Sequence, residues 1–100
     1  MNVKNITENN FAEVLSSEKT VLLDFWAPWC GPCRMMGPVL EEIAKEREDI
    51  IVGKINVDEE PALAMRFNVM SIPTFAVIKD GKVQTITSGA RPKSALEGLL

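Results

Sequence analysis

Short apolar segments alternate with helical patterns along the whole chain, and this order restricts the fold more than any other feature. Apolar and β-branched residues predict strands at 21–27, 50–57, 74–79 and 83–88, and a weaker edge strand at 3–6. Helical periodicity predicts helices at 7–17, 33–48, 58–67 and 91–100. Strand–helix–strand units favour parallel pairing, whereas Asp80-Gly81 favours a hairpin between the last two strands. The order predicts a single-domain α/β fold over residues 1–100, with a central mixed β-sheet flanked by helices on both faces.

Composition and charge exclude several classes of protein. The chain has 46% hydrophobic and 25% charged residues, as expected of a globular domain. Its net charge is −3 with the charges interspersed, so no basic face predicts nucleic-acid binding. The first ten residues are polar rather than signal-like, and no apolar run approaches the roughly 20 residues of a spanning helix. We expect a cytoplasmic protein that binds neither membranes nor nucleic acid, and we expect a monomer.

The only two cysteines stand in Cys30-Gly31-Pro32-Cys33, between a predicted strand and a predicted helix. Three interpretations compete. A structural disulfide closing so short a loop stabilises by only about 2 kcal/mol. A zinc or iron–sulfur site needs four ligands, and the chain has no histidine, so only a dimer pooling two pairs supplies them. The third interpretation is a redox dithiol, which is common for a close pair in a reducing compartment.

The position of the pair favours the redox dithiol. Unpaired N–H groups and positive potential at a helix N-terminus lower the pKa of a thiol just ahead of it, here Cys30. Cys33 lies one turn inside the helix, shielded, and close enough to attack the sulfur of Cys30. Pro32 suits a first helical turn because its missing N–H needs no partner there. Gly31 leaves room for the backbone of another protein.

The wider pattern resembles the thioredoxin family. The segment "DFWAPWCGPC" at 24–33 is followed by "IPT" at 72–74, "DG" at 80–81 and "GA" at 89–90, in the order and spacing of that family. The resemblance runs from near residue 5 to the C-terminus. It implies a thioredoxin fold and a protein dithiol–disulfide oxidoreductase that reduces disulfides in target proteins. No Gly-rich nucleotide loop is present, so we expect no cofactor and a separate thioredoxin reductase that restores the dithiol.

Asp24 interrupts the apolar segment "VLLDFWA" and has two interpretations. It is either a polar residue at a strand end or a buried carboxylate on the face of Leu22 and Trp26, where burial raises its pKa. The resemblance implies the second, with proton exchange between Asp24 and Cys33 through water. It also places Lys54 beside this carboxylate, although the residue pattern alone is equally consistent with a solvated lysine.

The resemblance implies a docking surface for target proteins. For Pro73 a trans bond is the commoner state, but the resemblance implies a cis Ile72–Pro73 bond beside the disulfide. Ile72 then offers its backbone N–H and C=O to an extended target segment. The apolar, uncharged residues expected around it are Trp29, Ile72, Pro32, Gly89 and Ala90.

Other bulky residues are interpreted as packing. We expect Trp26 to pack beneath the site, and we expect Met35, Met36, Met65 and Met70 to fill the core. A second function in another class stays open from the residues alone: a binding module that uses the surface around Trp29 and Ile72, with redox chemistry incidental. Turnover of a disulfide substrate distinguishes the two.

Overall fold

Five strands form one mixed sheet in the order β1-β3-β2-β4-β5. The computed structural model describes residues 3–100. The strands are β1 (Val3–Asn5), β2 (Thr20–Trp26), β3 (Ile50–Asn56), β4 (Thr74–Lys79) and β5 (Lys82–Ser88). β1, β3 and β2 run parallel, whereas β4 is antiparallel to both β2 and β5. The predicted mixed sheet is therefore confirmed.

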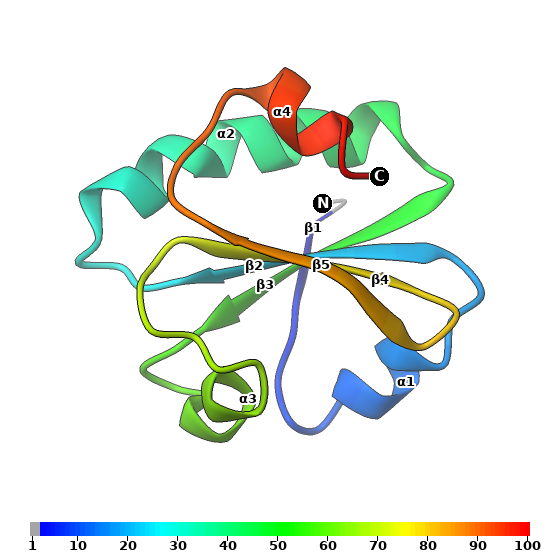
Figure 1. Cartoon of the computed structure of the whole chain (residues 1–100), viewed down its shortest axis with the longest axis horizontal. Helices are drawn as coiled ribbons and strands as arrows, with labels where there is room; N and C mark the ends of the chain where they lie inside the picture. The colour runs from blue at the N-terminus through cyan, green and yellow to red at the C-terminus, as the bar shows by residue number, and fades with distance from the viewer. Residues whose placement is uncertain (1–2) are drawn as a thin grey trace.

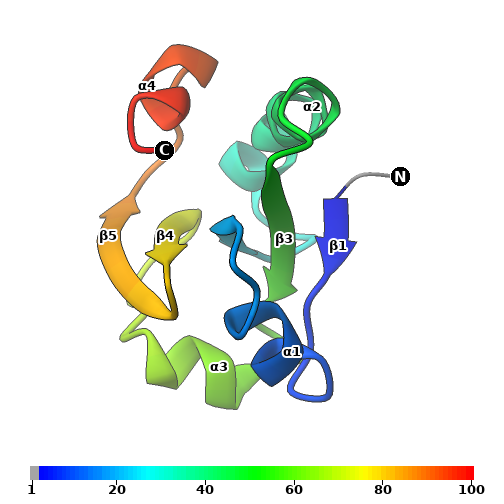
Figure 2. The same cartoon turned by 90° about the vertical axis from the view of Figure 1, so that its right-hand side faces the viewer.

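Helices cover both faces of the sheet, as predicted. α2 (Gly31–Glu46) and α4 (Lys93–Glu97) lie on one face, and α1 (Phe11–Leu15) and α3 (Pro61–Arg66) lie on the other. Figure 2 shows the same layers with the strands in between. None of the helices within residues 3–100 is long and apolar enough to cross a bilayer.

Side chains on the two faces of β2 belong to two separate hydrophobic clusters. Val21, Leu23 and Phe25 belong to the cluster beneath α1 and α3, whereas Leu22 belongs to the cluster beneath α2 and α4. All of these side chains are buried. Because successive strand residues point to opposite faces, Asp24 shares the α2 side with Leu22. The strand thus places one carboxylate in the same layer as the helix that carries the cysteines.

The sheet is irregular at its β4–β5 end. The hairpin between β4 and β5 turns at Asp80 and Gly81, with φ of 53° and 75°, which is the predicted tight turn. A bulge follows, because Ile78 pairs with Val83 but Val77 pairs with Thr85. The extra residue in β5 bends this edge strand and increases its twist.

Helix boundaries are where the sequence was least informative. The first helix covers only Phe11–Leu15 instead of 7–17. The side chain of Asn10 bonds to the N–H of Thr7 and the carbonyl of Asn5, so it holds a turn and does not cap the helix. The second helix begins at Gly31 instead of Cys33 and continues through Pro38 to Glu46. Its predicted buried stripe is confirmed: Cys33, Met36, Leu40, Ile43 and Ala44.

The prediction that all four methionines fill the core is wrong for three of them. Met36 is buried, but Met35, Met65 and Met70 are 74%, 78% and 94% exposed. On α2, Met36 lies on the stripe of Cys33 and Leu40, and Met35, one position earlier, is rotated by about 100° away from it. α3 buries only Leu63, so Met65 points outward.

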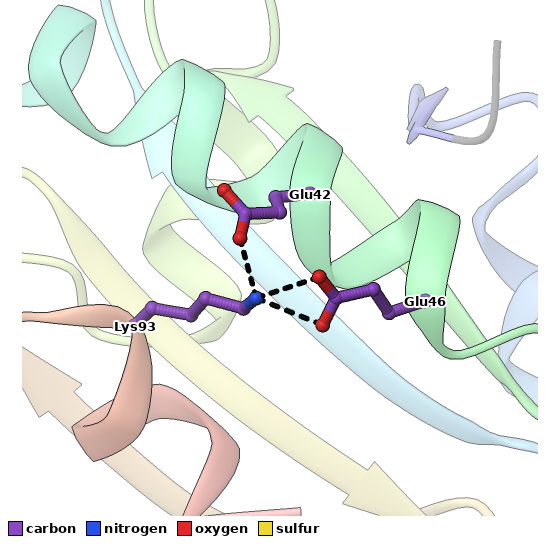
Figure 3. A network of polar contacts seen from close by, with 3 residues as sticks. All are labelled: Glu42, Glu46 and Lys93. Carbon is purple, nitrogen blue, oxygen red and sulfur yellow. Dashed lines mark hydrogen bonds and ion pairs between the residues drawn. The ribbon is translucent and has the colours of Figure 1, made fainter.

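An ion-pair cluster joins α4 to α2 (Figure 3). The Nζ of Lys93 lies 2.6 Å from Glu42 Oε1 and 2.8 Å from Glu46 Oε1. The hydrogen bond from Lys93 lowers the pKa of Glu42. Leu96, fully buried against the α2 side of the sheet, adds an apolar anchor. Together these contacts hold a helix of five residues, which is too short to be stable alone.

Gly53 on β3 is expected to tolerate no side chain. A Cβ there lies 2.5 Å from Ile6 Cγ1 and 3.3 Å from Leu23 Cδ2, both in the buried core. Gly53→Ala should therefore lower the free energy of unfolding by about 1–3 kcal/mol through overpacking. Gly37→Ala on α2 is the matched control, because its Cβ meets nothing within 4 Å. That variant should be stabilised by up to about 1 kcal/mol, and equal effects at the two sites in urea titrations would contradict the packing argument.

Candidate functional site

The cysteine pair lies where β2 ends and α2 begins. Cys30 is the N-cap residue of α2, and Pro32 lies in the first turn. The two cysteines are joined in a disulfide with their Cα atoms 5.2 Å apart. The backbone N–H of Cys33 points at Cys30 Sγ over 3.2 Å. A sulfur at this position therefore receives a donor that the helix leaves unpaired, which stabilises negative charge on Cys30 when the pair is reduced.

Access to the pair is narrow. Cys30 is 6% exposed and Cys33 is 3% exposed, and both pack with Ala27 in a small cluster that Trp26 and Ile72 border. A Cβ placed on Gly31 would meet nothing within 4 Å, so the segment between the cysteines faces open space. The turn at Gly31 is therefore open to a partner, although the two cysteines beside it are largely buried.

The segment before β4 closes the other side of the disulfide. The Ile72–Pro73 peptide bond is cis, as the resemblance implied. Cys30 Sγ lies 3.9 Å from the carbonyl oxygen of Ile72, a contact and not a hydrogen bond because a disulfide sulfur has no proton to donate. The N–H of Gly89 donates to the Pro73 carbonyl over 2.8 Å. This bond holds the start of the exposed Gly89-Ala90 segment against Pro73, the residue after Ile72.

Trp29 belongs to the surface and not to the core. Its side chain is 67% exposed, and its Nε1 donates to Asp58 Oδ2 over 2.8 Å. That bond fixes the indole ring at the edge of a groove of about 390 Å³. The groove is lined by Trp29, Val57, Ala64, Val69, Met70, Ser71 and Ile72. We refer to these seven residues as the apolar groove.

Asp24 is fully buried on the α2 side of the sheet. Neither of its carboxylate oxygens has a hydrogen-bond partner among residues 3–100. Burial raises the pKa of Asp24 to about 7, and the positive charge of Lys54 offsets part of that rise. Asp24 is therefore a group that changes protonation near neutral pH inside the protein. The interpretation as a polar strand end is excluded by its complete burial.

Lys54 lies opposite Asp24 in the parallel pairing of β2 and β3. It is half-buried, and its Nζ lies 4.2 Å from the centroid of the Trp26 ring. The ammonium group is thus held by an aromatic face next to the carboxylate and is not a freely solvated strand lysine. Trp26 itself is half-buried against the cysteine cluster, as expected.

Sequence reasoning missed part of this region. Asp58, which orients Trp29, and Val57, Val69 and Met70, which line the apolar groove, were not identified as site residues. One signal was present for Val57 and Asp58, because they follow directly on β3. The carboxyl ends of neighbouring parallel strands meet at one edge of a sheet, and β2 ends at the cysteine pair. No comparable signal marks Val69 or Met70.

Comparisons with known proteins agree with this geometry. A thioredoxin family model matches residues 2–100. A thioredoxin of Streptomyces clavuligerus is 50% identical, over 94% of this chain and 89% of the relative. A thioredoxin of Mycobacterium tuberculosis (strain ATCC 25618 / H37Rv) is 54% identical over 91% and 80%, and one of Porphyra purpurea is 47% identical over 100% and 95%. With its cysteine pair at the start of α2, this chain belongs to the thioredoxin family of protein dithiol–disulfide oxidoreductases.

Proposed function

We propose that this protein works as a reductant, giving two electrons to disulfides in other proteins. The observation that carries the proposal is the pair Gly31-Pro32 between the cysteines, at a helix N-terminus. Strong oxidants stabilise their reduced thiolate so far that the disulfide becomes the less favourable state. Neither Gly31 nor Pro32 adds a charge, and proline contributes no N–H. Only the helix terminus then stabilises the Cys30 thiolate, which favours a stable disulfide and a reducing couple.

The two cysteines take different roles in this proposal. The Cys30 thiolate attacks one sulfur of the target disulfide, and the other target sulfur leaves with the electron pair of the broken bond. Cys33 then loses its proton and attacks Cys30 Sγ, which releases the second target thiol and leaves the Cys30–Cys33 disulfide. The position of Cys30 at the N-cap and of Cys33 one turn inside the helix supports this assignment. As a thioredoxin the protein depends on a reductase to supply the next two electrons.

Asp24 acts as the proton acceptor for Cys33 in this scheme, through water. A group with a pKa of about 7 is matched to a thiol proton at neutral pH. Lys54 is assigned a supporting role: its charge keeps the pKa of the buried carboxyl from rising further. Both groups lie on strands that pair directly with one another.

Target proteins dock, in this proposal, on Trp29, Ile72, Pro73, Gly89 and Ala90. The backbone of Ile72 pairs with an extended target segment, and the neighbouring uncharged residues accept its side chains. The contact of 3.9 Å between Ile72 and Cys30 Sγ supports this arrangement, because it brings a paired segment next to the reacting sulfur. We assign the working protein to the cytoplasm, where a dithiol stays reduced, and to the monomer, since one chain supplies the whole site.

Equilibration with a glutathione buffer tests the direction of electron flow. We expect the Cys30–Cys33 disulfide to be harder to reduce than glutathione disulfide. The variant Pro32→His places a potential cation between the cysteines and should make the disulfide easier to reduce, by at least about tenfold in equilibrium constant. Thiol trapping followed by mass spectrometry measures both populations. A wild-type disulfide as readily reduced as glutathione disulfide would make the protein an oxidase or isomerase instead.

A further inference from the structure

Three of the four methionines interpreted by sequence as core residues are exposed, and one of them lies in the docking region. Met70 lines the apolar groove and is 94% exposed. It stands two residues before Ile72, whose carbonyl contacts the disulfide. Met35 and Met65 are also exposed but do not line that groove, and Met36 is buried. The protein therefore carries one accessible thioether, Met70, where targets are proposed to dock. The other three methionines serve as controls, because two are exposed outside the groove and one is buried.

We propose that Met70 is a site of modification by hydroperoxides, and that its oxidation to the sulfoxide weakens the docking of target proteins. This inference rests on the proposed docking role of the surface around Trp29 and Ile72. It adds a second redox-sensitive position to the site, distinct from the cysteine pair. The cysteines exchange electrons with targets, whereas Met70 alters how well a target is held.

The reaction balances with a hydroperoxide as the only co-reactant. A lone pair of the Met70 sulfur attacks the outer oxygen of the peroxide, and the O–O bond breaks. The sulfur loses two electrons and gains one oxygen, while the peroxide is reduced to an alcohol, or to water for hydrogen peroxide. The peroxide proton moves to the departing oxygen. Exposure governs which thioether reacts, so Met70 is expected to react fast and Met36 slowly.

The change in polarity explains the effect on docking. A thioether is a soft, apolar group, whereas the sulfoxide carries a strong acceptor oxygen. Apart from Ser71 and the indole N–H, the described residues that line the groove present apolar side chains, and Asp58 already accepts the indole N–H. A target that covers Met70 would bury the new oxygen among mostly apolar side chains, with the Ser71 hydroxyl as the one side-chain donor of the groove that Asp58 does not occupy, and this disfavours the complex. The disulfide chemistry is untouched, so the change appears in target binding alone.

The disulfide form of the protein allows the test to separate the two kinds of sulfur. Hydrogen peroxide is added while Cys30 and Cys33 are paired, so that no thiolate competes. Catalase then removes the peroxide, and dithiothreitol restores the dithiol but leaves the sulfoxide. Peptide mapping measures oxidation at each methionine, and insulin reduction gives KM and kcat. We expect KM of the treated wild type to rise about tenfold, equivalent to about 1.4 kcal/mol, with kcat unchanged.

Two leucine variants and an enzymatic repair complete the design. Each variant is compared with its own untreated form. Treatment should leave the KM of Met70→Leu unchanged, whereas Met65→Leu, which removes another largely exposed thioether outside the groove, should still show the rise. Methionine sulfoxide reductases A and B, supplied with dithiothreitol, should restore the wild-type KM.

The inference fails if treated Met70→Leu loses as much affinity as the wild type, or if KM is unchanged once mapping shows Met70 oxidised. It also fails if Met70 reacts no faster than the buried Met36. These outcomes differ from a failure of the proposed reductant function. In that case the untreated wild type would already fail to reduce insulin with dithiothreitol as electron donor.

Discussion

Replacing Asp24 by asparagine is expected to stabilise the protein by about 4 kcal/mol at pH 8. The carboxyl has a pKa of 3.8 in the unfolded chain and about 7 in the folded one. Below the lower value it is protonated in both states and has no effect on folding. As the pH rises between the two values, only the unfolded chain gains from ionisation, so the free energy of unfolding falls. Above about pH 7 the loss is complete, and the neutral amide avoids it.

Urea titrations of the disulfide form across pH 4–9 measure this difference. The stability gained by Asp24→Asn should shrink to less than about 1 kcal/mol at pH 4. Asp80→Asn makes the same chemical change at an exposed hairpin position whose positive φ asparagine tolerates. That control should differ little from the wild type at any pH. A pH-independent gain, or a less stable Asp24→Asn at pH 8, would contradict a buried acid of raised pKa.

Exchanging either cysteine for serine should abolish catalytic turnover, but with opposite effects on trapped intermediates. Cys33→Ser keeps the attacking thiolate and lacks the thiol that releases the target, so mixed disulfides through Cys30 should accumulate. Cys30→Ser keeps only the thiol inside the helix, which is 3% exposed in the native structure, and should trap few partners. Non-reducing electrophoresis with insulin chains or a cell extract separates the adducts. The double variant Cys30→Ser/Cys33→Ser supplies the background.

Comparable trapping by the two single variants would remove the distinction between attacking and resolving cysteine. The variant Asp24→Asn offers a second view of the same cycle. It should leave formation of the mixed disulfide largely intact and slow its resolution, since Cys33 then lacks the proton acceptor that we propose. Rapid-quench measurement of the two steps tells them apart.

The strands were predictable from sequence because a strand buried inside the sheet needs a run of apolar residues. The strands of 74–79 and 50–57 match β4 and β3 to within one residue, since they lie inside the sheet and must be apolar. The hairpin followed from Asp80-Gly81, where both residues adopt positive φ. Short helices were less predictable. Asn10 has the chemistry of a cap, yet its side chain bonds to Thr7 and Asn5, because a local turn competes with the helix for the same side chain.

The residues of the candidate site also fall into those that the sequence predicted and those that it did not. Cys30, Cys33 and Asp24 stood out because each is chemically unusual in its local sequence. The bond from Trp29 to Asp58 joins residues 29 positions apart, and no local pattern predicts that these two side chains pair. The prediction that the methionines are buried was wrong for another reason. Hydrophobicity indicates which residues can be buried, but not which of them are buried in the fold. α3 buries only Leu63, and both Met65 on that helix and Met70 in the segment after it stay exposed.

The bulged edge strand bears on which chains this small protein can recruit. An open edge accepts any extended segment, whatever its sequence, and so invites aggregation. The extra residue near Val83 and the neighbouring Lys82 make β5 a poor template, because a bent, charged edge cannot keep register with a straight strand. In the proposed docking mode, the backbone of Ile72 is the place where an added strand meets a sulfur. If targets dock at Ile72 as proposed, the irregular β5 edge adds to selectivity for cysteine-containing segments, because it disfavours strand addition at a place remote from the sulfurs.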